Sequence, residues 1–501
     1  MRKSSLLSRV LLFVLSSFCV AINVDAYSFE VNDIYYLINS NNPSEVSVTY
    51  AVEYDDEANG YSIYMDDVVI PETVTHEGST YTVTAINDHA FYGSRWLSSV
   101  SLPATVRSIG ASAFQYCPML ASINLPEGLE SIGDCAFYQD TLLTTINIPS
   151  TVKSIQGRAF AETGLTSVTI PASTTSIHSM CFSACQHLKS IMVEAGNPVY
   201  DSRSDCNAVI ETETDALLLG CKGTVIPSDV TTVGPSAFAY LNTLTEISVP
   251  ASVKEIGTHA FFACRGLKSV ELHDGLTTID DYAFYLCTSL SQIHIPATVT
   301  DIGASAFWHC ESLTGTLAIP PLVTMINNST FSGCESLTGI RIHDQVTMIG
   351  DFAFTGCKGL TSVQIGSSVT DINQLAFSSC DDLTRVICLA EVPPVFNGQW
   401  PTECFSNMAH LNATLYVPEE SLRYYRMANG WNCFNKIVGI DPASITCDVN
   451  GDGEVSVGDI NTVLDAILCH HGDWTSDANR DNEVNMADIN FILDQILGSS
   501  E

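Results

Sequence analysis

Residues 261–307 read FFACRGLKSVELHDGLTTIDDYAFYLCTSLSQIHIPATVTDIGASAF, and this stretch decides the fold because it contains one pattern twice. Phe261, Phe284 and Phe307 recur with a period of 23, and an alanine precedes each of them. Between them, residues 270–272 (VEL) and 293–295 (IHI) alternate apolar and polar side chains, as a short strand with one buried face does. The stretch therefore predicts one short strand in every period.

The same phenylalanine recurs along most of the chain. It occupies positions 91, 114, 137, 160 and 182, and then 238, 261, 284, 307, 331, 354 and 377. The intervals are 23, 23, 23 and 22 in the first block and 23, 23, 23, 24, 23 and 23 in the second. This period lies in the leucine-rich-repeat range, and such units bury their apolar sides only by stacking on their neighbours. We predict a leucine-rich-repeat solenoid over residues 81–390, with a parallel β-sheet on one face and Gly303 in a turn.

The repeat resembles the BspA-like leucine-rich-repeat family of bacterial surface proteins. The resemblance rests on strings such as Ile247-Ser248-Val249-Pro250, followed by Val253, Ile256-Gly257 and Ala260-Phe261, and it spans about residues 80–390. It implies an exported recognition protein, often called an adhesin, whose ligand is not fixed. The repeat lacks the asparagine ladder of the commonest leucine-rich repeats.

The 18 cysteines follow the repeat more than they suggest a disulfide framework. Eight of them lie three residues after a repeated phenylalanine: Cys117, Cys185, Cys264, Cys287, Cys310, Cys334, Cys357 and Cys380. One cysteine per repeat forms a column rather than pairs, so we expect small, buried, unreactive side chains. Cys206 and Cys221 flank a hairpin predicted within an insertion at about residues 194–225, and whether they pair is left open.

The flanking segments predict export and capping. Residues 1–26 have a basic start, an apolar run and small residues before a cleavage point, which is typical of a signal peptide. No later stretch approaches the length of a membrane span. Residues 27–80 are predicted to form an N-terminal β-cap and residues 391–441 a C-terminal cap, because an open solenoid exposes its core and its sheet edges. We expect a secreted protein, either released from the cell or held at its surface by other contacts.

Charge and motif content exclude several functions. The chain has 20 basic and 56 acidic residues, a net charge of −36, which argues against nucleic acid as a partner. No zinc-protease helix motif, nucleophile elbow or phosphate loop is found in the sequence. We therefore expect a binding protein and not an enzyme.

The acidic C-terminal segment contains two calcium-loop patterns, one starting at Asp448 and the other at Asp477. Each pattern places side-chain oxygens at loop positions 1, 3, 5, 9 and 12 and uses a backbone carbonyl at position 7, as calcium loops do. The predicted ligands of two Ca²⁺ ions are Asp448, Asn450, Asp452, Glu454, Ser456, Asp459, Asp477, Asn479, Asp481, Glu483, Asn485 and Asp488.

Each loop precedes an apolar helical stripe, and two such stripes can pack face to face. The stripes are Ile460, Val463, Leu464, Ile467, Leu468 and Ile489, Ile492, Leu493, Ile496, Leu497. Residues 446–499 resemble a type I dockerin, a small all-α calcium-binding domain. The resemblance implies a cohesin-type partner at Val457, Gly458, Met486 and Ala487, although these differ from the hydroxyl pairs of the best-known dockerins. A stand-alone calcium-stabilised terminus and an accessory subunit of a polysaccharide-degrading complex stay open as alternatives.

The outward strand positions are where the repeats would contact a host, microbial or polysaccharide ligand. By register these positions are Ser101, Asn124, Asn147, Thr169, Ser248, Glu271, His294, Arg341 and Gln364. Most of them are small and polar, so a solvated face is as consistent with the pattern as a binding face.

Overall fold

The computed structural model describes residues 27–50, 64–399 and 401–441, together with residues 460, 463–464, 478 and 488–493. The expected signal peptide at 1–26 and most of the expected module at 446–499 lie outside the described residues.

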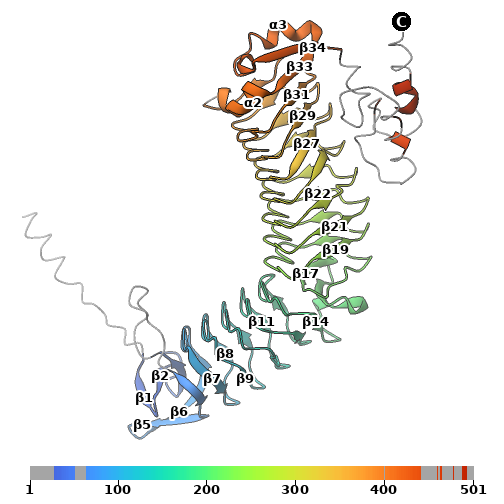
Figure 1. Cartoon of the computed structure of the whole chain (residues 1–501). Helices are drawn as coiled ribbons and strands as arrows, with labels where there is room; N and C mark the ends of the chain where they lie inside the picture. The colour runs from blue at the N-terminus through green and yellow to red at the C-terminus, as the bar shows by residue number, and fades with distance from the viewer. Residues whose placement is uncertain are drawn as a thin grey trace, which may run out of the picture.

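The repeats form a parallel β-solenoid in which each repeat makes one coil (Figure 1). Successive coils pair in register, so that Ser269 lies beside Gln292 and Val270 beside Ile293. One column, here called the longer-strand column, consists of strands of three to six residues together with the shorter β23, and it is the predicted sheet. Its strands are β7 (Trp96–Ser101), β9 (Ser122–Asn124), β12 (Ser167–Ile170), β14 (Ser190–Val193), β19 (Glu246–Val249), β21 (Ser269–Leu272), β23 (Gln292–Ile293), β25 (Gly315–Ala318), β27 (Leu337–Arg341), β29 (Ser362–Ile365) and β31 (Arg385–Cys388).

The prediction of a sheet on one face only is incomplete, because each coil adds a second, two-residue strand. Ile279 pairs in parallel with Ile302, and both are buried. Two residues are too few for an alternation to show in the sequence. The second column comprises β8 (Ser108–Ile109), β10 (Ser131–Ile132), β11 (Ser154–Ile155), β13 (Ser176–Ile177), β18 (Thr232–Val233), β20 (Glu255–Ile256), β22 (Thr278–Ile279), β24 (Asp301–Ile302), β26 (Met325–Ile326), β28 (Met348–Ile349), β30 (Asp371–Ile372) and β32 (Val395–Phe396).

Gly303 begins the predicted turn, because its carbonyl oxygen accepts the Ala306 N–H at 3.3 Å, but the turn is not what requires a glycine. Its φ is not positive, and a Cβ atom on Gly303 would lie 2.3 Å from the backbone nitrogen of Asp281 in the preceding coil. Glycine is needed at this position because two coils approach closely, not because the chain turns.

The core consists of stacked phenylalanine rings and a ladder of thiols. The ring centroids of Phe261, Phe284 and Phe307 are separated by 5.1 Å and 5.2 Å, and the rings are nearly parallel. The eight cysteines of the predicted column are buried and free, which confirms that expectation. Each thiol also donates a hydrogen bond to the carbonyl of a phenylalanine one coil earlier. For Cys310 and the Phe284 carbonyl oxygen, the Sγ···O distance is 3.3 Å. Burial raises the pKa of the Cys264 thiol to about 12.

Asp140 occupies the position that these cysteines hold in other coils. It follows Phe137 by three residues and is fully buried. Oδ1 accepts a hydrogen bond from the Cys117 N–H at 2.8 Å, whereas the buried Oδ2 has no hydrogen-bond partner. Burial raises the pKa of the Asp140 carboxyl well above its ordinary range. The neutral acid suits this position, because a charged carboxylate that is buried with one oxygen unpartnered is costly.

We expect Asp140→Asn to stabilise the N-terminal repeats at neutral pH by about 1–3 kcal/mol, because the amide still accepts the Cys117 N–H and buries no charge. The pKa of Asp140 is raised in the folded chain above its unfolded value. The free energy of unfolding of the native chain therefore falls as pH rises from the pKa of Asp140 in the unfolded chain to its pKa in the folded chain. The stability difference between the asparagine variant and the native chain grows over the same pH range. Amide hydrogen exchange of residues 108–140 at pH 4.5 and pH 7.5 measures the difference. An equal effect at both pH values, or a destabilised variant at pH 7.5, would contradict this account, and the exposed Asp381→Asn serves as the matched control.

The insertion between the two repeat blocks forms an antiparallel hairpin of β16 (Ala208–Glu211) and β17 (Ala216–Gly220), preceded by β15 (Tyr200–Asp201), which pairs with β16. The two faces of the hairpin pack into different hydrophobic cores. Val209 and Leu219 belong to the N-terminal core, whereas Ile210 and Leu217 belong to the C-terminal core. The hairpin is thus a wall between two cores, and Figure 1 shows that the solenoid axis changes direction between β14 and β17.

Cys206 and Cys221 are free thiols in this structure and do not form a disulfide. Cys206 is buried in the C-terminal core, and Cys221 is buried in the N-terminal core. The two side chains therefore point into opposite sides of the wall.

The N-terminal end of the described array carries additional strands. β1 (Phe29–Val31), β2 (Ile34–Ile38) and β3 (Glu45–Thr49) are antiparallel, and β4 (Met65–Val69) pairs with β7. The strands β5 (Thr73–His76) and β6 (Ser79–Ile86) form a hairpin, and β6 pairs with β3 and β8. These pairings continue the solenoid sheets into the segment at the N-terminal end.

At the C-terminal end, Phe405 stacks on Phe377 at 4.9 Å and so extends the phenylalanine column beyond residue 390. Trp431 is buried beside it and donates its indole N–H to the Pro394 carbonyl oxygen at 2.9 Å. β33 (Thr414–Pro418) pairs with β31, and β34 (Lys436–Ile440) pairs with β33, so the longer-strand column continues as well. The helices of this end are α2 (Asn407–Asn412) and α3 (Leu422–Tyr425).

Candidate functional site

The predicted ligand-face residues lie on the outward side of the longer-strand column. Ser248 pairs in register with Glu271, and Arg341 with Gln364. Asn147 lies in a segment that is not a strand. Arg341 and Gln364 are half-buried, whereas the other predicted positions are exposed: Ser101, Asn124, Asn147, Thr169, Ser248, Glu271 and His294.

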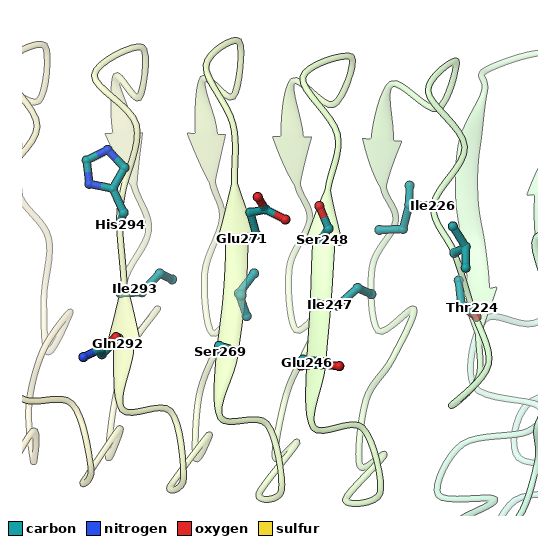
Figure 2. Close-up of a pocket in the computed structure, with 12 residues that line it drawn as sticks. Thr224, Ile226, Glu246, Ile247, Ser248, Ser269, Glu271, Gln292, Ile293 and His294 are labelled. Atoms are coloured by element: carbon teal, nitrogen blue, oxygen red, sulfur yellow. The ribbon is translucent and has the colours of Figure 1, made fainter. Parts of the chain in front are cut away.

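The structure brings three of these residues together in one hollow of about 660 Å³, here called the β19 hollow. Ser248, Glu271 and His294 form one row across β19, β21 and the end of β23 (Figure 2). A second row, formed by Glu246, Ser269 and Gln292, lies two residues earlier on the same strands. The sequence reasoning missed this second row because it took only one outward position per strand. The same period-two alternation predicts both.

The β19 hollow exists because the hairpin interrupts the longer-strand column. Residues 224–226 lie one coil before β19 and form no strand with it, because their hydrogen bonds go to the residues that directly precede the hairpin. The Val225 N–H donates to the Cys206 carbonyl at 3.0 Å, and Thr224 Oγ1 donates to the Asn207 carbonyl at 2.8 Å. In the sheet order β19-β21-β23, β19 is consequently an end strand, and its free edge faces residues 224–226.

The β19 hollow is acidic and has one exposed apolar wall. Glu246 and Glu271 are exposed, and within the described part of the chain no lysine or arginine forms an ion pair with either carboxylate. The basic group beside Glu271 is His273, whose Nε2 is 3.5 Å from Glu271 Oε1. Val225 is 72% exposed, which is unusual for valine and leaves an apolar surface beside the two acids.

The chemistry of these residues suits reversible binding. Carboxylates, a primary amide, hydroxyls and an imidazole supply both acceptors and donors. Ser248 and His294 come from strands separated by β21, so neighbouring-strand spacings of about 4.8 Å place their backbones two spacings apart. The described side chains of the hollow show no hydrogen-bonded serine–histidine pair of the kind that activates a nucleophile.

Only one predicted calcium ligand is among the described residues. Asp488 is fully buried and is one of the described helical residues 488–493. Its oxygen donors fit a hard cation such as Ca²⁺. The other eleven predicted ligands and the predicted partner residues Val457, Gly458, Met486 and Ala487 lie outside the described residues. No group of three metal-binding side chains is found in the part of the chain that the structure describes.

The described fragments of the C-terminal segment share one apolar cluster. Val463, Ala478, Ile489 and Ile492 are buried together. Ile460, Leu464 and Phe491 pack against them. These contacts join the two apolar stripes identified in the sequence, as face-to-face packing of two helices requires.

Parallel coils that repeat at the interval of the phenylalanines, with an outward strand face, define a leucine-rich-repeat solenoid protein. The chain belongs to the BspA type leucine-rich repeat family, because the model of that region matches residues 63–189, 220–336 and 314–426, more than half of the chain. Among the described residues, no helix has the length and apolarity that crossing a membrane requires.

Two solved structures are similar in fold. A leucine-rich repeat protein from Bacteroides ovatus is similar at 25% identity and a TM-score of 0.54, covering 83% of this chain and 100% of its own. A leucine-rich repeat protein from Eubacterium ventriosum is similar in fold, with 22% identity and a TM-score of 0.51, covering 71% of this chain and 88% of its own. No curated protein matches the sequence.

Proposed function

We propose that this protein is a secreted or cell-surface binding protein without catalytic activity, whose repeats recognise a ligand through their outward strand face. The β19 hollow is the observation that carries the proposal. It is a hollow of about 660 Å³ on the outward strand face, and it brings together three of the residues that register predicted for ligand contact. Membership of a leucine-rich-repeat family supports the choice of this face, since solenoids use extended surfaces for recognition.

We further propose that residues 446–499 form a calcium-dependent dockerin-like module that docks onto a cohesin-type protein. The support is the duplicated ligand pattern that begins at Asp448 and Asp477, and the apolar cluster that joins the stripes following each loop. Calcium, when bound, would neutralise the negative charge of the carboxylate ligands and hold the two loops against their helices. The residues of both loops would bind and orient; none is assigned a chemical step.

The alternative role is that of an accessory subunit in a polysaccharide-degrading complex. The dockerin-like pattern alone favours it. In that case the repeats would direct an enzyme complex to its polymer, and the chain itself would still not cleave glycans.

A calcium-controlled pull-down separates these roles. The intact exported chain is used as bait against the secreted and surface proteins of the producing organism, in millimolar calcium or in excess EGTA, and in parallel against glycan and protein arrays. We expect array binding in both conditions and capture of a cohesin-bearing protein in calcium only. Absence of binding to either array would contradict the recognition role, and glycan hydrolysis by the purified chain would contradict the non-catalytic assignment.

A further inference from the structure

We propose that the β19 hollow binds an extended peptide segment that carries lysine or arginine and adds to the free edge of β19. This inference rests on the proposed binding function and names the class of ligand for one part of the outward face. Three features of the hollow support it: a strand edge without a neighbouring strand, two carboxylates without a lysine or arginine partner in the described chain, and an exposed apolar side chain.

The strand edge is the first feature. β19 pairs with β21 on one side only, and no backbone hydrogen bond joins residues 222–226 to residues 245–250, all of which are described. Strands in the interior of the column, such as β21 and β29, have a neighbour on both sides. The N–H and C=O groups of a free strand edge form a template onto which an extended chain can add.

The second feature is charge. Glu246 lies on the edge strand β19 and Glu271 on the next strand, in a different row of the hollow, so that long basic side chains of a strand added to β19 extend across the face toward both carboxylates. Neither is paired with a lysine or arginine of the described chain. A basic side chain would gain a charge-assisted hydrogen bond at each carboxylate, and the net charge of −36 would favour its approach.

The third feature is the apolar side chain of Val225, which is 72% exposed. The aliphatic stem of lysine or arginine can cover this surface while its charged end reaches a carboxylate. No phenylalanine, tyrosine or tryptophan is among the described residues that line the hollow. These residues therefore offer no large aromatic face on which a sugar ring would stack, and this favours a peptide over a glycan.

The test uses the intact chain and a fluorescent peptide of alternating lysine and threonine, ten residues long, at low ionic strength. We expect this peptide to bind, and we expect a glutamate–threonine peptide of the same length not to bind. A lysine–threonine peptide that is N-methylated at every residue keeps its side-chain charges but loses all of its backbone donors. It should bind more weakly if edge pairing occurs.

Substitutions then locate the binding. Glu246→Gln with Glu271→Gln should raise Kd roughly 3- to 30-fold, as loss of two exposed ion pairs predicts. Val225→Arg places an internal base in the hollow and should weaken binding to a similar degree without affecting folding, since the side chain is exposed. Asp381→Asn with Asp382→Asn removes the same charge at exposed positions outside the hollow and should leave Kd unchanged.

An equal loss of affinity in the Asp381/Asp382 control would show diffuse charge attraction and overturn the assignment of the site. Equal binding of the N-methylated peptide would overturn the edge pairing. Binding of an oligosaccharide that depends on Glu246 and Glu271, without peptide binding, would make the hollow a glycan site instead. If array ligands bind the intact chain but the hollow variants change nothing, this inference fails while the proposed function stands.

Discussion

Phe284→Ala is expected to destabilise the C-terminal repeats by about 3–5 kcal/mol, the usual cost of removing a fully buried phenylalanine. The cavity is costly to close because Phe261 and Phe307 are held at 5.1 Å and 5.2 Å by their own coils. The carbonyl of Phe284 also accepts the Cys310 thiol, so a shift of this coil strains the next one. Urea unfolding combined with hydrogen exchange of residues 238–330 measures the loss and its spread.

Phe352→Ala is the matched control, because this phenylalanine lies in the same array but is 38% exposed. Its cost should be smaller, about 1–2 kcal/mol, since more than a third of its surface stays in water in the folded chain. Similar losses for both variants would show that the stack contributes nothing beyond ordinary surface packing. Exchange protection that stays unchanged outside one coil would contradict coupling between neighbouring coils.

Removal of calcium is expected to unfold the C-terminal segment and leave the array intact. The described part of the apolar cluster, around Val463, Ile489 and Ile492, is small, and in the proposed module bound ions would supply much of the stability. Each site would contribute about 2.7 kcal/mol when free calcium is about 100 times its Kd. Hydrogen exchange of residues 488–493 in calcium and in EGTA measures this effect.

Asp477→Asn should reproduce the effect of EGTA in part, because it changes the first ligand of the second loop. Asp494→Asn removes the same charge within the module but lies outside both loop patterns, and it should behave as the native chain does. Protection of residues 488–493 that survives EGTA would contradict the calcium assignment. Restored protection after readdition of calcium would distinguish reversible unfolding from damage.

Much of the solenoid is predictable because its spacing is periodic. The interval of 23 between phenylalanines is enough to locate the phenylalanine stack, the longer strands and the cysteine column. The second column is not predictable in the same way, because strands such as Thr278–Ile279 have only two residues. The hydrogen bonds from the cysteine thiols to the phenylalanine carbonyls could not be predicted from the sequence either. The spacing of the cysteines does not show which carbonyl lies beside each thiol.

The site is less predictable than the fold. Register places Ser248, Glu271 and His294 on one face, and alternation could have added Glu246, Ser269 and Gln292. Nothing local in the sequence shows that residues 224–226 bond to the hairpin and leave β19 without a neighbour. That outcome depends on a contact between Val225 and Cys206, which are distant in the sequence, and on the bend that the insertion imposes.

The hairpin wall also bears on how such a chain can change in length. Each hydrophobic core touches only one face of β16 and β17, so a coil gained or lost in one arm leaves the packing of the other arm as it was. Gene segments that encode whole repeats could therefore be duplicated or deleted on either side, while the angle between the arms is inherited unchanged. The length of the solenoid would then vary among descendant proteins, whereas the angle between its two parts would stay the same.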